Sequence, residues 1–411
     1  MTAPNLNPES NDVDAKGSAL SRASAASLRE LAADDRLRQL RSVAPDGKYI
    51  HANSKKLLNF ASNDYLGLSQ HPALIDAAIE ATRKFGVGSG ASRLISGTQP
   101  IHTQVEQRFA SFKHAEAAIL LASGYTANLA ALNTLAGPGD LIVLDKLVHA
   151  SLIDAARASG AEVRTFPHLK LERAEELLKR QASGRRLLVT DSVFSMDGNC
   201  ADLPALCDLA DRSDAVLVVD EAHATGVMGD DGSGLASAQG VAERIYTCGE
   251  GGVLISTASK ALGSLGGIIT ASKPVIDLIV NKARSFIYST AVPPAQAASI
   301  NAAMDVIEQG PGLRQQLLDH VMQVRAAVAD RGWALQNSSN TQATPILPLI
   351  VGSEQDALRL ASHLHDHSID APAIRPPTVA PASSRVRLTL RADFTSQDID
   401  TLLQALDMFH K

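Results

Sequence analysis

The sequence predicts an α/β protein with a mostly parallel central sheet covered by helices on both faces, followed by a smaller α+β domain. Between about residues 60 and 290, short apolar segments alternate with amphipathic helical segments, as in a parallel sheet buried on both sides. Near residue 300 longer helices and a strand of alternating polarity replace this pattern. The 411 residues also exceed the roughly 250–300 at which a single core stops growing, so a second domain is expected.

We expect four parts along the chain. Residues 1–26 are rich in Ala, Ser and Asn and predict a loose, disordered tail. Residues 27–58 are expected to hold a helix, opened by the capping box Ser27-Leu-Arg-Glu30, and then an extended arm. The large domain should cover residues 59–295, and the small α+β domain residues 296–411.

The elements of both domains follow from apolar periodicity. The strands expected in the large domain are Ala118–Leu121, Leu141–Asp145, Glu162–Phe166, Leu187–Asp191, Ala215–Asp220, Gly252–Ser256 and Gly267–Ala271. Its helices are expected at His71–Phe85, Ile101–Lys113, Thr126–Leu135, Ser151–Ser159, Glu172–Arg180 and Leu203–Ala210. The small domain should contain helices at Ala295–Glu308, Gly312–Arg331 and Ser396–Phe409, strands at Pro345–Val351 and Arg385–Leu390, and a helix capped by Ser353.

Composition excludes several classes of function. Lys and Arg total 38 against 44 Asp and Glu, and aromatic residues make up only 4%, so nucleic acid is not an expected partner. Apolar runs such as Ala215–Val219 are much shorter than the roughly 18–20 residues that cross a bilayer. Residues 1–26 match neither a secretory nor a transit signal, and the three cysteines form no Cys-x-x-Cys pair. We therefore expect a cytoplasmic protein with no membrane partner.

Two patterns resemble binding motifs without predicting a site. The run Gly86-Val-Gly-Ser-Gly90 follows a helix rather than a strand, and Ala91 stands where the dinucleotide fingerprint would continue, so that fingerprint fails. Of His363, His365 and His367, only the first and the last share a helix face. No third ligand lies nearby in the sequence, so no metal site is expected.

Two strands deliver reactive side chains to the same edge of the predicted sheet. Ala215–Asp220 ends in an acid, and His223 follows three residues later. The strand that begins at Gly252 runs through small residues to Lys260, which has no acidic residue within four positions. An amine in an apolar pocket can have its pKa lowered toward ~7–8, which makes it a nucleophile. Ligands bind at this carboxyl edge in open parallel sheets.

Two further segments complete a chemical set at that edge. The strand Ala118–Leu121 leads through Ser123-Gly124 into a helix, whose first N–H groups and dipole favour a phosphate. The loop Asp191–Gly198 brings Ser195 nearby. Each feature alone has an ordinary structural explanation. Together, an amine for a Schiff base, an acid for a ring nitrogen and a helix terminus for a phosphate predict a site for pyridoxal 5'-phosphate (PLP).

A series of segments runs in order through most of the chain: Asn59–Gly67, Gly88–Arg93, Ser195–Gly198, Asp220–Gly226 and Thr257–Lys260. In this order they resemble the α-oxoamine synthases, PLP-dependent transferases of fold type I with an aspartate-aminotransferase-like architecture. These enzymes condense an amino acid with an acyl thioester and release carbon dioxide. Through Ile374–Val379 and Arg385–Leu390 the chain is most similar to the members that join L-alanine to a pimeloyl thioester in biotin synthesis.

The resemblance implies a role for each cofactor-binding residue. Lys260 would form the covalent bond to PLP and later move the substrate's α-proton. Asp220 would pair with the pyridinium nitrogen, His223 would lie near the ring hydroxyl, and His149 would stack on the ring. The other cofactor-binding residues implied are Gly124, Tyr125, Ser195, Thr257, Ser289 and Thr290. Ser289 and Thr290 match a segment that a partner subunit lends to the phosphate, which implies a homodimer with shared active sites.

The resemblance also implies how substrates are held. The implied substrate-binding residues are Asn63, His149, Arg375 and Thr378, and for the acyl group Arg38. Arg375 would hold the alanine carboxylate. Arg36 and Arg41 lie close to Arg38, so the arginine that meets the acyl substrate stays open. Whether that substrate is pimeloyl-CoA or pimeloyl-acyl carrier protein stays open too.

Three departures from the family pattern concern loops. Ala258-Ser259 stands where the family usually has Phe-Gly, and Ala380–Ser384 replaces the usual Pro-Gly-Thr. The interval between His223 and Lys260 is also longer than in close relatives, with the extra residues around 243–251. No catalytic group is lost, but the loop before the lysine is expected to differ in shape.

Three other functions remain open from the sequence. One is an α-oxoamine synthase that uses glycine or serine, such as glycine C-acetyltransferase. Another is an aminotransferase of the same fold. A third, of a different class, is a catalytically silent partner subunit, although this chain keeps both Lys260 and Asp220.

Overall fold

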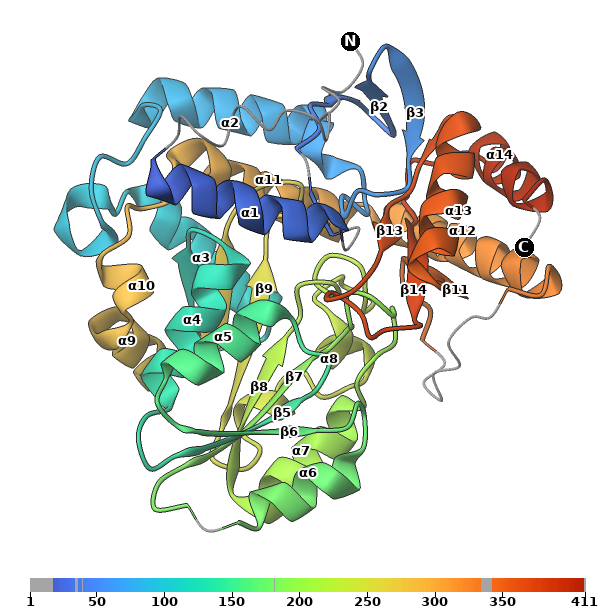
Figure 1. Ribbon diagram of the computed structural model, residues 1–411. Helices are drawn as coiled ribbons and strands as arrows, with labels where there is room; N and C mark the ends of the chain where they lie inside the picture. The colour runs from blue at the N-terminus through green and yellow to red at the C-terminus, as the bar shows by residue number, and fades with distance from the viewer. Residues whose placement is uncertain (1–17, 34–35, 39, 181, 334–341, 410–411) are drawn as a thin grey trace.

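A mixed sheet forms the centre of the computed structural model, which describes residues 18–33, 36–38, 40–180, 182–333 and 342–409 (Figure 1). Its strand order is β4-β10-β9-β8-β7-β5-β6. The strands are β4 (Ala117–Leu121), β5 (Leu141–Asp145), β6 (Glu162–Phe166), β7 (Arg186–Asp191), β8 (Ala215–Asp220), β9 (Gly252–Thr257) and β10 (Gly267–Ala271). Neighbouring strands from β9 to β6 are parallel, and β10 is antiparallel to both of its neighbours. The connection from β9 to β10 is too short for a crossover helix, so this pair is antiparallel.

Helices connect and cover the strands as the periodicity predicted. The predicted helices are α2 (Pro72–Phe85), α3 (Pro100–Phe112), α4 (Gly124–Leu135), α5 (Ala150–Ala158), α6 (Leu171–Leu178) and α7 (Leu203–Ser213). Shorter or unpredicted elements are η1 (Leu68–Gln70), the π-helical η2 (Arg93–Gly97), α8 (Leu235–Ala238), η3 (Arg244–Tyr246), α9 (Lys273–Lys282) and α10 (Arg284–Ile287). The α/β class with a mostly parallel sheet is therefore confirmed.

The N-terminal segment begins earlier than predicted. Helix α1 (Ala19–Ala33) contains Ser27, so the prediction that Ser27 opens the helix is wrong. The alanines before Ser27 favour helix over other conformations, and Ser18 accepts a hydrogen bond from the Ser21 N–H at 3.2 Å at the helix start. The expected tail is thus helical from residue 19, and residues 1–17 lie outside the described residues.

The N-terminal arm and the C-terminal part of the chain share a sheet. The arm consists of β1 (Ala44–Asp46), β2 (Tyr49–Ala52) and β3 (Lys55–Asn59), and β3 pairs in parallel with β12 (Ile369–Asp370). The C-terminal elements are α11 (Pro294–Gln309), α12 (Pro311–Asp330), β11 (Ile346–Gly352), α13 (Glu354–Asp366), β13 (Ala373–Ile374), β14 (Ser384–Thr389) and α14 (Ser396–Asp407). Strands β11, β14 and β13 form an antiparallel sheet, and α11 packs against α2 of the large part (Figure 1). Among the described helices, none is both long and apolar enough to cross a bilayer.

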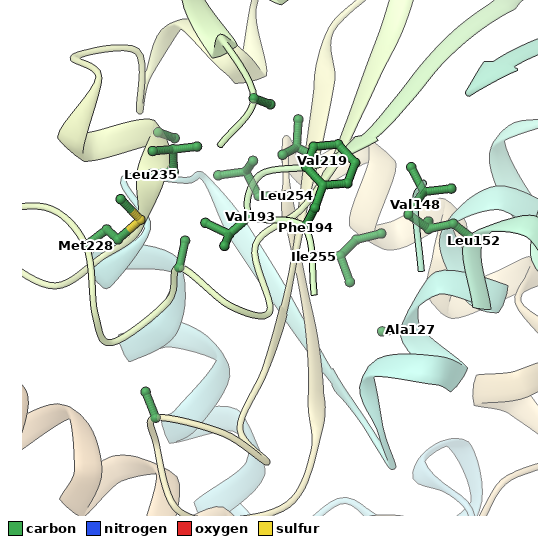
Figure 2. Close-up of a cluster of buried hydrophobic side chains, with 14 of the residues drawn as sticks. Ala127, Val148, Leu152, Val193, Phe194, Val219, Met228, Leu235, Leu254 and Ile255 are labelled. Carbon is green, nitrogen blue, oxygen red and sulfur yellow. The ribbon is translucent and has the colours of Figure 1, made fainter. Parts of the chain in front are cut away.

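The carboxyl ends of the central strands rest on a buried apolar cluster. Every residue of β8 and β9 is buried, because helices cover both faces of the sheet. Figure 2 shows Val193, Phe194, Val219, Leu254 and Ile255 gathered near the strand ends, with Val148 and Leu152 beside them. This packing fixes the positions of the residues that follow the strands.

Candidate active site

A cavity of about 200 Å³ lies at the predicted carboxyl edge of the sheet. It is lined by Ser123, Gly124, Tyr125, Asn128, His149, Ser151, Asp191, Val193, Asp220, Ala222, His223, Thr257, Ser259 and Lys260. The structure thus brings together seven residues that the sequence singled out, namely Lys260, Asp220, His149, His223, Gly124, Tyr125 and Thr257. A larger cavity of about 650 Å³, between α12 and residues 227–230, is lined by none of these groups.

Lys260 reaches the cavity from the loop after β9. Its Nζ lies 2.8 Å from His223 Nε2. Burial of the amine, which outweighs the opposing effect of the Asp220 and Asp191 carboxyls, lowers the pKa of Lys260 to about 8. About a tenth of the amine is therefore neutral at pH 7, far more than for a lysine with the ordinary pKa of 10.5, and a neutral amine is a nucleophile and a base.

His223 is held by the buried Tyr65. The Tyr65 hydroxyl donates to Asn63 Oδ1 at 3.2 Å and lies 2.6 Å from His223 Nδ1. His223 Nδ1–H therefore donates to the tyrosine oxygen, and Nε2 accepts from Lys260. Burial, followed by the positive charges of Lys260 and Arg387, holds the pKa of His223 well below its usual value. Burial also raises the pKa of Tyr65 to about 12, so its hydroxyl keeps its proton.

Asp220 is the last residue of β8, and each of its carboxylate oxygens accepts a hydrogen bond. Oδ2 accepts from Asn128 Nδ2 at 2.8 Å, and Oδ1 accepts from the Ala222 N–H at 2.9 Å. Asp191 is its register partner on β7. Burial and the charge of Asp220 raise the pKa of Asp191 well above its usual value. Asp220 is thereby fixed in direction, which suits a group that pairs with a protonated ring nitrogen.

His149 caps the N-terminus of α5 on another wall of the cavity. Its Nδ1 accepts from the Ser151 N–H at 3.3 Å and lies 2.7 Å from Ser151 Oγ. Its backbone N–H donates to Asp191 Oδ2 at 3.1 Å. Burial lowers the pKa of His149, which favours the neutral ring.

The start of α4 offers a cradle for an anion. Ser123 caps the helix by accepting from the Thr126 N–H at 3.2 Å, and the first N–H groups of a helix have no intrahelical acceptor. A Cβ on Gly124 would come within 3.3 Å of Thr257 Cβ, so glycine lets the helix start against that side chain. The hydroxyls of Thr257 and Ser259 lie 2.9 Å apart at the same place. Ser259 thus adds a second hydroxyl beside that of Thr257.

Other predicted residues do not line the cavity. The Ser195 carbonyl accepts from Arg387 Nε at 2.7 Å, and Arg387 Nη2 donates to Asn63 Oδ1 at 3.0 Å, so both residues join the Tyr65–His223 chain. Five more predicted residues lie outside the lining of this cavity: Ser289, Thr290, Arg375, Thr378 and Arg38.

Of these, Thr290 is exposed and forms an isolated bridge with Ser92. The Arg375 carbonyl accepts from the Thr378 N–H at 3.1 Å in the turn before β14. Of the neighbouring arginines, Arg41 makes a bidentate ion pair with Asp370, with both bonds at 2.7 Å, so its guanidinium is already engaged.

The extra residues before the lysine strand dock away from the cavity. Arg244 pairs with Asp208 and Asp211 on α7, and Asp211 also accepts from the Gly249 N–H at 2.6 Å. None of residues 243–251 lines the cavity. Residues 243–251 therefore contribute no side chain to the lining.

Four contributors were missed as functional residues: Tyr65, Asn128, Ser151 and Arg387. Asn128 could have been identified from the sequence, because an amide side chain in the apolar helix segment Thr126–Leu135 is expected to hydrogen-bond to a buried partner. Ser151 also follows His149 at the spacing of a helix cap. The contacts of Tyr65 with His223 and of Arg387 with Ser195 gave no such signal, because these partners are 158 and 192 positions apart in the sequence.

Comparisons with known proteins agree with this geometry. The sequence profile of the aminotransferase class I and II family matches residues 55–406. The chain is 42% identical over 381 residues to a putative 8-amino-7-oxononanoate synthase of Desulforudis audaxviator, covering 92% of this chain and 96% of that one. It is 41% identical over 384 residues to the 8-amino-7-oxononanoate synthase of Geotalea daltonii, covering 92% and 95%.

Solved structures share the fold. Sphingomonas wittichii serine palmitoyltransferase superposes with a TM-score of 0.87 at 25% identity, covering 95% of this chain and 98% of that one. The 8-amino-7-oxononanoate synthase of Francisella tularensis gives a TM-score of 0.73 at 26% identity, covering 85% and 96%. The prediction of a fold type I transferase is confirmed. The chain belongs to the aminotransferase class I and II family and, within it, to the 8-amino-7-oxononanoate synthases.

Proposed function

We propose that this protein is a PLP-dependent acyltransferase that condenses L-alanine with a pimeloyl thioester. The products are 8-amino-7-oxononanoate, carbon dioxide and the free thiol. One observation carries the proposal: the amine of Lys260, with its pKa lowered to about 8, shares a cavity with the buried carboxylate of Asp220 and the start of α4. The names of the relatives support the choice of substrates and a role in biotin synthesis.

The cavity residues fit PLP. Asp220, held by Asn128 and the Ala222 N–H, suits the protonated ring nitrogen. The start of α4 and the hydroxyls of Thr257 and Ser259 suit the phosphate. When bound, PLP supplies an electron sink for the carbanion formed at the amino acid. A related solved structure, serine palmitoyltransferase with PLP, has a TM-score of 0.86 at 26% identity and covers 95% of this chain and 97% of that one.

The chain's own side chains would do the remaining work. Lys260 holds the cofactor, and its neutral amine takes the α-proton of alanine and later returns a proton to the product. His223 keeps that amine hydrogen-bonded at 2.8 Å. His149 would stack on the ring of the bound cofactor, and Ser195 would help to orient it. Because an arginine binds a carboxylate through two parallel bonds, Arg375 can orient the Cα–H bond for proton removal.

The rest of the substrate is assigned to three residues. Asn63 and Thr378 define the pocket around alanine. Arg38, which is exposed next to α1, meets the acyl thioester. Of its two neighbours, Arg41 is occupied by Asp370, and this supports the choice of Arg38 over Arg41.

We also propose a homodimer in which a second copy completes the site with Ser289 and Thr290. The segments around these residues expose large apolar side chains: Val87 is 81%, Ile95 80% and Tyr288 71% exposed. The bridge between Ser92 and Thr290 holds the two segments together. Exposed apolar side chains concentrated in this way mark an interaction surface.

Thiol release tests the proposal. Purified protein would be incubated with PLP and pimeloyl-CoA, and L-alanine, glycine or L-serine would be offered separately. Release with alanine alone is the expected result. Release chiefly with glycine or serine would overturn the substrate, and no release with a functional cofactor band would point to another acyl donor. Lys260→Ala should abolish both the visible absorbance of bound PLP and thiol release, and a variant that kept both would refute the assignment.

A further inference from the structure

Two side chains without a role in the reaction above connect Asp220 to His149. Asn128, on α4, donates one amide N–H to Asp220 Oδ2 at 2.8 Å and one to Ser151 Oγ at 2.7 Å. Ser151 Oγ lies 2.7 Å from His149 Nδ1. Asn128 is 1% exposed and Ser151 0%, so bulk water does not compete for these bonds.

The chemistry of the groups fixes the direction of each bond. A carboxylate accepts hydrogen bonds, so Asn128 turns its nitrogen, not its oxygen, toward Asp220. The same nitrogen donates to Ser151, whose oxygen therefore accepts. The Ser151 hydroxyl proton then needs an acceptor. Within the described part of the chain, His149 Nδ1 is the one acceptor within hydrogen-bond distance of that hydroxyl.

His149 Nδ1 therefore accepts, and the ring proton lies on Nε2. The Ser151 backbone N–H adds a second donor to Nδ1 at 3.3 Å. A proton on Nδ1 would face both donors and would leave the buried hydroxyl proton unpaired, which costs about 1–3 kcal/mol for a buried polar group. Burial of the ring disfavours the charged form as well.

We infer that Asn128 and Ser151 are positioning residues that hold His149 as a neutral imidazole with its proton on Nε2. The nitrogen that remains for the cavity is then a hydrogen-bond donor, which suits an anionic oxygen of the substrate. The opposite tautomer would present a lone pair to that oxygen. The role of His149 toward the substrate rests on the proposed function. The position of its ring proton follows from the hydrogen bonds alone.

Charged groups around His149 do not reverse this assignment. They are Asp220 on β8, Lys260 after β9 and Asp154 on α5, together with Asp191 on β7, which accepts from the His149 backbone N–H. Asp220 and Asp154 favour the charged ring, and Lys260 opposes it. The Asp220 carboxylate acts on the ring through space, while its hydrogen bonds go to Asn128 Nδ2 and to the Ala222 N–H.

Long-range ¹H–¹⁵N NMR of histidine rings tests the inference directly. Full-length protein labelled with ¹⁵N-histidine would be recorded with and without PLP, and His149→Asn would identify the His149 signals. We expect Nε2 to carry the proton and Nδ1 to give the signal of an acceptor nitrogen near neutral pH.

Two variants interrupt the connection at different points. Ser151→Ala removes the hydroxyl, and Asn128→Leu replaces both amide donors by an apolar side chain of similar size. Each should give a mixture of His149 tautomers, and kcat/KM for L-alanine should fall about tenfold, the effect of one buried hydrogen bond. Ser159→Ala is the matched control, because Ser159 lies at the other end of α5 and donates to the Ala156 carbonyl at 2.7 Å. This variant should keep both the tautomer and the rate.

The NMR and kinetic results for these variants distinguish the inference about His149 from its failure and from failure of the proposed function. A shifted tautomer population in both variants, with melting temperatures close to that of Ser159→Ala, supports the inference. A wild-type ring protonated on Nδ1, or a tautomer unchanged in both variants, overturns it. If Asn128→Leu does not fold, Ser151→Ala alone decides. If the tautomers respond but no thiol is released from any acyl donor, the proposed function fails and the inference about His149 stands.

Discussion

The buried amine of Lys260 should make the cofactor-free protein less stable at neutral pH. The perturbation is Lys260→Met, which keeps most of the side-chain length and removes the ionisable group. Burial lowers the pKa of Lys260 from 10.5 to about 8. Folding therefore disfavours the protonated amine, and methionine removes that penalty.

The magnitude follows from the pKa. The shift corresponds to roughly 3 kcal/mol, at 1.36 kcal/mol per unit. Water reaching the partly exposed side chain reduces this value, and the lost hydrogen bond between Lys260 and His223 costs about 1 kcal/mol. We expect Lys260→Met to raise the free energy of unfolding by about 1–2 kcal/mol at pH 7.

Because folding lowers the pKa of Lys260, its effect on the free energy of unfolding depends on pH. Between about pH 8 and 10.5 the unfolded chain keeps the Lys260 proton and the folded chain does not. Stability therefore rises with pH through this window. The advantage of Lys260→Met is complete below pH 8 and disappears as pH rises through 10.5.

Urea unfolding of cofactor-free wild type and Lys260→Met at pH 7 and pH 10 measures the difference. Lys273→Met is the control, because Lys273 is 61% exposed and pairs with Asp277 on the surface. It should change stability little at either pH. A Lys260→Met protein that is no more stable than wild type at pH 7, or whose advantage is the same at both pH values, would refute the reasoning.

Two further predictions concern buried contacts around the site. Lys113→Met should lower the free energy of unfolding by about 3–5 kcal/mol because it leaves the buried Glu221 carboxylate unpaired, and the double variant with Glu221→Leu should recover most of the loss in urea titrations. A double variant as unstable as the single one would contradict this. Tyr65→Phe should remove the partner of His223 Nδ1 and lower kcat/KM about tenfold, measured by thiol release. A lower melting temperature with an unchanged kcat/KM would show that Tyr65 only stabilises the fold.

Most strands of the central sheet could be predicted because they are continuous apolar runs between polar turns. The bounds of β5, β6, β8 and β10 agree with the prediction at both ends. Burial on both faces leaves few alternatives to a strand for β5, β8 and β10, whereas β6 lies at the edge of the sheet and is mostly exposed. The start of α1 was missed because none of its residues is buried, so no apolar face marks where the helix begins.

Some residues of the candidate site could be predicted from the sequence and others could not, depending on whether a local pattern places them. Asp220 ends β8 and Lys260 follows β9 after two residues, and their meeting at one edge is a consequence of parallel topology. Tyr65 and Arg387 reach the site through side chains from distant segments, and no local pattern encodes such contacts. The roles of Ser289, Thr290 and Arg375 stay predictions, since they depend on a second copy or on bound substrate.

The long reach of these contacts has a consequence for folding. His223 bonds to a residue 158 positions away, and Asn63 to one 324 positions away. Contacts so distant in sequence form late, after the loops between them have closed. Until β14 has been synthesised and has docked, the chain of bonds from Arg387 through Asn63 and Tyr65 to His223 is incomplete. Full ordering of the pocket is therefore a signal that the whole chain has folded, and a ribosome-bound fragment lacking β14 would not display it.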